Sequence, residues 1–431
     1  MGTSEPNVDT EKHNVAATVE EDSRGQMDEG PRAWTVVAGA WCCLFCGFGW
    51  VNAIGIFQEY YQHNQLRNYS ASSISWILSL EPFVLFAAGI VLGRVFDNYG
   101  PRWMLVIGTF LHVFGLMMIS ISSEYYQLLL AQGICSPLGA SFVFYPASAC
   151  TATWFDKRRA LAFGIMSSGS SIGGVVFPAM LSRLLPRVGF GWSLRIAAFV
   201  VLALLIVANL TVRSRIAPVP RRIRFSDYVG PFTEVPFVLL MVAACLGFWA
   251  MFVPINYVIL EAQEDGVSRN LAEYLLTILN AASLPGRILP GYFGDKLGRF
   301  NVMIAMCALS ALTILVLWIP GTLLAPGSAA VYVIFSLLYG FASGAFVGMV
   351  PALLSQITED MTKTGVRQGV LYTCMSIATL TGSPIAGAIL SRQQGKYWGL
   401  QVFAGVMMVG SVVFFIIARV VLGGASLKKR L

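Results

Sequence analysis

The stretch "GRVFDNYGPR", residues 93–102, is a charged turn between two long apolar segments. The chain repeats it as "GYFGDKLGRF", residues 291–300, and both copies have the spacing G-x-x-x-D-x-x-G. Asp295 follows Asp97 by 198 residues. The last glycine of each copy, Gly100 or Gly298, permits a tight connection between two helices because it has no Cβ atom. The repeat therefore predicts the same helical hairpin once in each half of the chain.

The rest of the chain is strongly apolar. Of its 431 residues, 56% are hydrophobic and 12% are charged, whereas soluble domains carry about 25% charged residues. A helix needs about 20 residues to cross a bilayer, and in lipid its backbone amides have to be satisfied within the segment. We expect an all-α membrane protein with twelve transmembrane helices. They lie at about 34–57, 73–95, 102–121, 127–153, 159–182, 191–211, 234–260, 270–293, 301–320, 328–357, 367–390 and 397–422.

Lysines and arginines are unevenly distributed among the predicted loops. If the polar N-terminal tail is cytosolic, the cytosolic segments hold twenty of the 29 basic residues and the outer loops hold six. Cytosolic loops of membrane proteins carry such an excess of positive charge. We therefore expect a multi-pass protein, by default of the plasma membrane, with both termini in the cytosol. The net charge of +7 reflects this topology, and no nucleic-acid partner is expected.

Further repeats divide the chain into two related halves. The sequence "GASFVFYPA", residues 139–147, matches "GAFVGMVPA", residues 344–352, in its Gly-Ala and Pro-Ala pairs. Duplicated halves of this kind are typical of transporters. We expect five regions in chain order. They are a disordered cytosolic tail (1–32), a six-helix bundle (33–211), a basic cytosolic linker (212–233), a second six-helix bundle (234–422) and a basic tail (423–431).

The two charged turns, placed between spans two and three and between spans eight and nine, resemble the signature loop of the major facilitator superfamily. Within it, "GFGWVNAIGIFQEYY" in span one and "TWFDKRRALAFGIMSSGSSIGG" at the start of span five resemble the monocarboxylate-porter family, especially its fungal branch. The resemblance covers residues from about 33 to 425. It implies two pseudo-symmetric six-helix bundles that rock about a central site lined by spans one, four, seven and ten.

In the superfamily that the chain resembles, this loop forms a cytosolic latch that is made in one conformation and broken in the other. Carried over, Asp97 with Arg102, and Asp295 with Arg299, would bias the balance between inward-facing and outward-facing states. An aspartate at this level can also meet the N-terminus of a neighbouring helix. The alternative is that these charges only set the topology and cap helices.

Arg287, in "SLPGRILPG", is a positive charge near the middle of span eight. A charge at this depth costs about 2.5–3.5 kcal/mol on insertion scales and marks a functional candidate. Its guanidinium can hold a carboxylate by two parallel hydrogen bonds, or it can be neutralised by another helix. The resemblance implies a matching arginine in proton-coupled monocarboxylate porters, together with an aspartate and a lysine. This chain has Ser283 and Asn52 at those places, so lactate–proton symport is not expected, and a larger or less acidic substrate is.

Glu81, in "SLEPFV", is a second ionisable residue within a span and a candidate for proton coupling. It could equally lie in a water-filled outer vestibule or bond to the helix break made by Pro82. Further substrate contacts are expected from polar residues of spans one, four, seven and eight, although such residues also serve interhelical packing. These candidates are Asn52, Tyr145, Asn256, Tyr257 and Asn280.

These features predict a secondary active transporter of a small organic solute, an organic anion or monocarboxylate-like metabolite, that works by alternating access. The expected partners are the substrate, the lipid bilayer and, for coupling, protons. An ATP-driven pump is not expected because the chain has no P-loop. No catalytic residue, cofactor or metal site is expected, since the eight cysteines lie in apolar blocks. Asn68 begins a glycosylation sequon in the first predicted outer loop.

Three alternatives stay open. The first is an exporter of a secondary metabolite, because the glycine-rich fifth span resembles the antiporter motif of drug exporters, although it lacks that motif's Gly-Pro pair. The second is a nutrient receptor that binds without net flux, against which the short tails weigh. The third is an intramembrane enzyme, which would need paired aspartates, a Ser-His set or a histidine cluster.

Overall fold

The computed structural model describes residues 30–218, 220 and 224–424, and within these ranges the regular structure is helical throughout. The predicted N-terminal and C-terminal tails, 1–32 and 423–431, lie almost entirely outside the described residues, as do Arg221 and Arg222 of the basic linker.

The first half forms one continuous series of helices. They are α2 (Pro31–Val51), α3 (Ile54–His63), α4 (Ala71–Ala87), α5 (Gly89–Tyr99), α6 (Pro101–Ile119), α7 (Tyr125–Leu128), the π-helix η1 (Leu129–Cys135), α8 (Ser136–Trp154) and α9 (Arg159–Thr211). Several of them are segments of one span: α2 and α3 are separated only by Asn52 and Ala53, and α4 and α5 only by Ala88.

The second half repeats the pattern after a short helix in the linker. Its elements are α10 (Ser226–Thr233), α11 (Val235–Glu264), α12 (Arg269–Leu297), α13 (Arg299–Leu312), the π-helix η2 (Thr313–Trp318), α14 (Ile319–Leu324), α15 (Ala329–Gln356), the 3₁₀-helix η3 (Met361–Lys363), α16 (Thr364–Arg392) and α17 (Trp398–Gly423).

Ten helical stretches of the described chain are long and apolar enough to cross a membrane. The 53-residue α9 contains two crossings, because Gly189 has φ 76° and breaks the helix between predicted spans five and six. The charged α12 does not meet the hydropathy criterion, yet it is a 29-residue helix packed among the others. With α9 counted twice and α12 added, the described residues form twelve crossings, and the predicted all-α fold is confirmed.

Each charged turn joins two helices at a glycine with positive φ. Gly100, with φ 76°, ends α5, and Pro101 follows at the first position of α6. Gly298, with φ 101°, separates α12 from α13 in the same way. Proline at a helix start costs no hydrogen bond and a left-handed glycine stops the preceding helix. The hairpins expected from the G-x-x-x-D-x-x-G pattern are therefore present in both halves.

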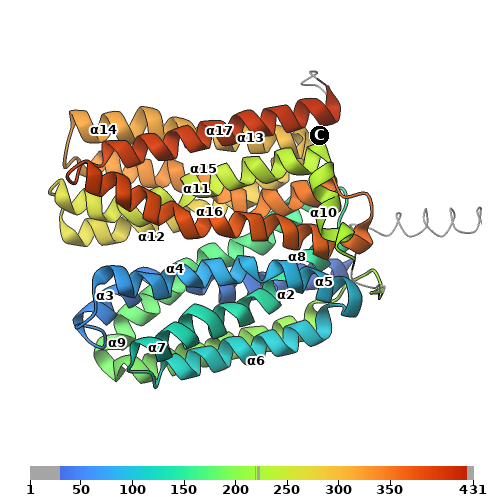
Figure 1. The fold of residues 1–431 in the computed structure, drawn as a ribbon, viewed down its shortest axis with the longest axis horizontal. Coiled ribbons are helices and arrows are strands. Elements are labelled where there is room, and N and C mark those ends of the chain that lie inside the picture. Colours follow the sequence, from blue (N-terminus) through green and yellow to red (C-terminus); the bar gives the residue numbers. More distant parts are fainter. Residues whose placement is uncertain (1–29, 219, 221–223, 425–431) are drawn as a thin grey trace, which may run out of the picture.

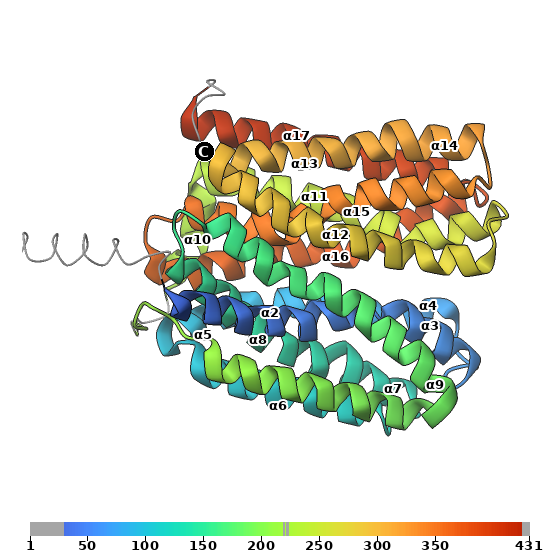
Figure 2. The same cartoon turned by 180° about the vertical axis from the view of Figure 1, so that it is seen from behind.

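The helices are arranged in two bundles side by side. Figure 1 shows the elements from α2 to α9 in one layer and those from α11 to α17 in the other, and the reverse view in Figure 2 agrees. The linker helix α10 and the turn after α5 lie at one end of the molecule, which we call the linker end. The α3–α4 connection and α14 lie at the opposite end, which we call the far end.

Two close helix crossings join the bundles near the linker end. Where α5 crosses α16, a Cβ atom added to Gly93 would overlap the carbonyl oxygen of Gly365, and one added to Gly369 would overlap that of Gly89. Where α12 crosses α9, a Cβ on Gly291 would overlap the carbonyl oxygen of Ala160. Small residues allow such direct backbone contact between membrane helices.

Candidate functional site

A cavity of about 840 Å³, including space open to solvent, lies between the two bundles. It is lined from both halves of the chain, by residues of α2, α4, α8 and α9 and by residues of α11, α12, α15 and α16. The lining residues belong to predicted spans one, two, four, five, seven, eight, ten and eleven, so the four spans that the resemblance implied are among them. The central site that the resemblance implied thus corresponds to a cavity between the two bundles.

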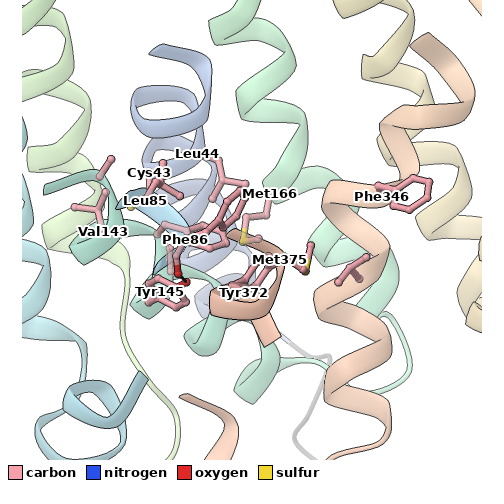
Figure 3. Packing of buried hydrophobic residues seen from close by; sticks show 14 of the residues in the cluster. Cys43, Leu44, Leu85, Phe86, Val143, Tyr145, Met166, Phe346, Tyr372 and Met375 are labelled. Carbon is pink, nitrogen blue, oxygen red and sulfur yellow. Dashed lines mark hydrogen bonds between the residues drawn. The ribbon is translucent and has the colours of Figure 1, made fainter. Parts of the chain in front are cut away.

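Aromatic side chains form most of the cavity wall on the linker side. Phe86 of α4 stacks on Tyr372 of α16, with ring centroids 5.3 Å apart and an interplanar angle of 3°. Phe144 meets the edge of the same Tyr372 ring, and Phe248 of α11 meets the edge of Phe86. Figure 3 shows Phe86, Tyr145 and Tyr372 gathered at this level. Because these rings come from both bundles, the layer packs the two bundles against each other.

The aromatic layer was not predicted from the sequence, because only polar residues of the spans were considered as substrate contacts. A signal was nevertheless present, because Phe48 and Phe248 occupy related places in spans one and seven and both line the cavity. Apolar residues are the normal wall of a ligand pocket, and a few polar groups orient the ligand.

Arg287 is the positive charge of this cavity. It is 7% exposed, and its Nη1 donates to the carbonyl oxygen of Ser167 at 2.5 Å and to the Ser170 hydroxyl. Both acceptors lie on α9, so the guanidinium bridges the two bundles. Its Nε–H has no hydrogen-bond partner among the described residues. Arg287 is therefore both a contact between the bundles and a donor available to a ligand.

Two of the predicted polar residues lie beside Arg287 in the cavity wall. Asn280, about two helical turns away on α12, is 5% exposed, and its Nδ2 has no partner among the described residues. Asn52, at the break between α2 and α3, donates to the carbonyl oxygens of Phe48 and Ser170. The structure thus brings Asn52, Asn280 and Arg287 to one cavity.

Ser283, the residue expected to replace a family aspartate, also lines the cavity. Its hydroxyl donates to the carbonyl oxygen of Asn280 at 2.7 Å and lies 2.7 Å from the Ser171 hydroxyl of α9. Ser171 is therefore the donor in this pair. The described residues that line the cavity include no aspartate or glutamate, and a second neutral contact joins the bundles instead.

The other three predicted contacts lie elsewhere. Tyr145 is 1% exposed and donates to the carbonyl oxygen of Phe86 at 2.7 Å, which fixes α8 to α4 beneath the cavity. Asn256 and Tyr257 both bond to Ser383, the first to its hydroxyl and the second to its carbonyl oxygen, and so join α11 to α16. The expectation that these three line the cavity was wrong, because their polar groups are used between neighbouring helices.

The aspartates of the charged turns cap helices of the opposite bundle. Asp97 accepts from the amides of Gly365 and Val366, both at 2.9 Å, in the first turn of α16. Asp295 accepts from the amides of Ala160 and Leu161, at 3.0 and 2.8 Å, in the first turn of α9. The first amides of a helix lack partners within it and favour a negative charge. Each turn therefore holds the helix of the other half by two hydrogen bonds.

The two arginines expected beside these aspartates differ. Arg299 donates from Nε to Asp295 at 3.0 Å and from Nη2 to the carbonyl oxygen of Asp156. Arg102 is exposed at the start of α6, and no contact with Asp97 is defined for it among the described residues. The positive φ of Gly100 turns the chain between the two residues, so the pairing of Asp97 with Arg102 was wrong. Arg94, on the same helix as Asp97, instead pairs with Asp227 of α10 at 3.3 Å.

The hydrogen bonds defined between the described parts of the two bundles lie at the level of the cavity or between it and the linker end. They join Arg159 to Ser355, Asp295 to Ala160 and Leu161, Ser283 to Ser171, Arg287 to Ser167 and Ser170, Arg299 to Asp156, Asp97 to Gly365 and Val366, and Thr373 to Ala87. Hydrogen bonds thus join the two bundles at the cavity and on its linker side.

Glu81 and Asn68 lie toward the far end. Glu81 is 2% exposed inside the first bundle, immediately before the cavity residue Pro82. Asn68 is exposed in the connection between α3 and α4. The serine of its sequon, Ser70, caps α4 by accepting from the amide of Ser73.

The profile of the Major Facilitator Superfamily matches residues 39–264 and 238–428. "MFS-type transporter 1" of Ophiocordyceps sp. is 51% identical, over 94% of this chain and 88% of its own. The "Fujikurins efflux protein" of Gibberella fujikuroi is 46% identical, over 90% and 83%. The "Aspyridones efflux protein apdF" of Emericella nidulans is 40% identical, over 90% and 78%.

Solved transporters share the fold at low sequence identity. The crystal structure of the transporter FucP in the outward conformation superposes with a TM-score of 0.69 at 15% identity, over 89% of this chain and 98% of that one. A bacterial homologue of the iron transporter ferroportin gives a TM-score of 0.71 at 13% identity, over 90% and 99%. At this identity the likeness concerns the fold alone. By profile, relatives and fold together, the chain belongs to the major facilitator superfamily of membrane transporters.

Proposed function

We propose that this protein exports a small amphipathic metabolite through the cavity between its bundles. Two relatives whose names describe them as efflux proteins, at 46% and 40% identity over most of this chain, support the direction of transport. The proposal therefore places export of a secondary metabolite ahead of uptake of a monocarboxylate, which the sequence alone favoured.

The cavity lining supports the substrate class. Arg287 and Asn280 present N–H donors without partners among the described residues, and around them stand Phe48, Phe86 and Phe248. An unpaired buried donor costs about 1–3 kcal/mol, so a ligand that supplies an acceptor is favoured there. The substrate we propose has an apolar body and one acidic or hydrogen-bond-accepting group. An organic anion fits this description, and this pairing of donors and aromatic rings carries the proposal.

The chain also fits the fungal branch of the monocarboxylate-porter-like family, which we propose as its place in the superfamily. Its binding chemistry would differ from that of proton-coupled monocarboxylate porters. Ser283 and Asn52 stand where that family is expected to carry an aspartate and a lysine, and both are neutral members of the cavity wall.

We further propose that the linker end is cytosolic and that the two charged turns form the latch on that side. The excess of basic residues in the segments at this end supports the orientation. The capping of α16 by Asp97 and of α9 by Asp295 supports the latch. The state described is then closed to the cytosol. Both termini would be cytosolic, in a protein that we place in the plasma membrane.

The test is untargeted metabolite profiling of cells and medium with the gene deleted, restored and overexpressed. Export predicts a compound that accumulates inside the deletion strain and appears in the medium on overexpression. The Arg287→Gln protein, present at the wild-type level in the membrane, is expected to leave the compound inside.

Two outcomes would contradict this function. A compound that stays in the medium on deletion, and disappears faster on overexpression, would identify an uptake carrier. Unchanged metabolite levels with an altered transcriptional response to a nutrient would favour a receptor without flux.

A further inference from the structure

A buried carboxyl group lies directly behind the cavity wall, in the half of the first bundle nearer the far end. Glu81 on α4 is 2% exposed, and its Oε2 has no hydrogen-bond partner among the described residues. Its neighbours Pro82 and Leu85 on the same helix line the cavity. Glu81 belongs neither to the proposed substrate contacts nor to the proposed latch.

Glu81 belongs to a small polar cluster built from three elements. The side-chain amide of Gln132, fully buried in the π-helix η1, faces the carboxyl group. The hydroxyl of Tyr61, on α3, donates to Gln132 Oε1 at 2.6 Å. Gln132 Nε2 also has no partner among the described residues. π-helical turns are rare and are frequent at functional sites, and here the π-helix carries the residue that faces Glu81.

Within the described part of the chain, no lysine or arginine is found to act on this carboxyl group. The helices packed against α4 are α3, α5, α8, η1 and α16. In α3, α8 and η1 there is no lysine or arginine, and Arg367 and Arg392 lie near the two ends of α16. Arg94 of α5 pairs with Asp227 of α10 at 3.3 Å. The titratable group that faces Glu81 is the Tyr61 hydroxyl. An isolated buried carboxylate is so costly that such a group takes up a proton instead.

Three other carboxyl groups of the described spans have hydrogen-bond partners. Asp97 and Asp295 each accept from two backbone amides. Glu261 Oε1 accepts from Gln401 at 2.7 Å, on the side of α11 that faces α17, whereas its Oε2 has no partner among the described residues. Glu261 is absent from the cavity lining, and neither neighbour of it in the chain lines the cavity. Glu81 therefore stands apart as a carboxyl group that adjoins the cavity without a charged partner.

The internal repeat supports its place at the cavity edge. Counted at the 198-residue spacing of the charged turns, Pro82 corresponds to Asn280 and Leu85 to Ser283, and all four line the cavity. Glu81 corresponds in the same way to Leu279, which also lines the cavity. The place that Glu81 holds in the first half is thus a cavity-lining position in the second half.

We propose that Glu81, oriented by Gln132 and Tyr61, is the proton site that couples transport to a proton gradient. In the state described, closed at the linker end, the carboxyl O–H bond is formed with a proton taken from water on the far side. When the bundles rock to open the linker end, that O–H bond breaks and the proton passes to water on that side. One proton then enters for each metabolite that leaves. This coupling rests on the proposed export function.

The first test follows the proton itself in the purified full-length protein in liposomes, without any metabolite. Infrared difference spectra between acidic and alkaline buffer report the C=O stretch of protonated carboxyl groups. We expect a component from a water-shielded carboxylic acid that is absent in Glu81→Gln and present in the matched control Glu261→Gln. If Glu81→Gln does not elute as a folded protein, Gln132→Leu keeps the carboxyl group and is expected to shift the same component. Spectra of Glu81→Gln and wild type that coincide would overturn the proposal.

The second test measures coupling. Proteoliposomes containing a pH-sensitive dye are given the metabolite extract of the deletion strain, and uptake is followed by mass spectrometry. Wild type and Glu261→Gln are expected to move protons with the compound, whereas Glu81→Gln is expected to keep metabolite exchange and lose the proton signal. Proton movement by Glu81→Gln equal to wild type would overturn the proposal. If wild type takes up nothing from the extract, the export function fails, and the infrared result alone decides the proton site.

Discussion

At the scale of single residues, the decisive group is the Arg287 guanidinium, which serves two partners. It reaches across from α12 to Ser167 and Ser170 on α9 and lines the cavity with its Nε–H unpaired. A bound anion would compete with the two α9 oxygens for the same guanidinium. Under the proposed function, substrate binding and the contact between the bundles are linked through this one side chain.

Replacing Arg287 by glutamine should weaken substrate binding and transport strongly. A hydrogen bond to a charged group is worth about 1.5–3 kcal/mol, which corresponds to roughly a ten- to hundredfold loss of affinity. Arg287→Lys should be intermediate, because an ammonium keeps the charge without the planar fork. Concentration-dependent efflux would measure the effect. Arg195→Gln is the control, since Arg195 donates to Ser120 away from the cavity; equal losses in both variants would contradict the assignment.

Two asparagines, both predicted to bind substrate from the sequence, should behave differently. Asn280→Ala should raise the KM for efflux several-fold, because its unpaired Nδ2 lies in the cavity wall. Asn256→Ala should leave the KM unchanged and lower the melting temperature, since it removes only the bond to Ser383. A reversed pattern would show that the cavity described is not the binding site.

At the scale of elements, the α5–α16 crossing holds the linker end together through backbone contact. Gly93→Ala would place a methyl group on the carbonyl oxygen of Gly365, and overpacking of this kind costs about 1–3 kcal/mol. We expect a lower melting temperature and faster hydrogen exchange at the start of α16. Gly230→Ala in α10 is the control, because nothing lies within 4 Å of its added Cβ. Unchanged amide exchange at the start of α16 in Gly93→Ala would show that this backbone contact does not hold the two helices together.

At the scale of the whole molecule, the charged turn of each bundle caps a helix of the other bundle. A substitution in one turn should therefore destabilise the start of a helix in the opposite bundle. Asp97→Asn should speed amide exchange at Gly365 and Val366, and Asp295→Asn should do so at Ala160 and Leu161. The loss of a charged cap is worth about 0.5–2 kcal/mol at each site. Hydrogen exchange with mass spectrometry would measure both regions in each variant.

The matched control for both aspartates is Arg102→Gln. Arg102 is an exposed residue of the first charged turn, residues 93–102, and has no defined contact with Asp97. It should leave exchange unchanged in all four amides. An effect of Arg102→Gln equal to that of Asp97→Asn would restore the simple pairing of the two residues.

The orientation of the molecule can be tested at Asn68. If the far end faces the lumen of the secretory pathway during synthesis, the exposed sequon should carry a glycan. Glycosidase treatment should then increase the mobility of the wild-type protein on a gel and leave that of Asn68→Gln unchanged. A glycan that persists in Asn68→Gln would place modification elsewhere, and an unmodified protein in a glycosylating host would speak against this orientation.

The sequence by itself determined the elements and their order. Apolar blocks of helical length have only one way to satisfy their backbone in lipid, and the repeated G-x-x-x-D-x-x-G turn marks the same hairpin in both halves. It also singled out Arg287 and Glu81, because a charge within an apolar block is visible without any knowledge of packing. The break of α9 at Gly189 and the turns at Gly100 and Gly298 follow from glycine in the same local way.

Only the tertiary structure decided which polar groups face one another. Tyr145, Asn256 and Asn280 are all polar residues within apolar spans, so the sequence does not distinguish them. Tyr145 and Asn256 form hydrogen bonds to neighbouring helices, whereas Asn280 lines the cavity. Asp97 meets two amides 268 and 269 residues away instead of an arginine five residues on. Such partners depend on the rotation of each helix about its axis and on the contact between bundles, and neither quantity is encoded in the local pattern of one span.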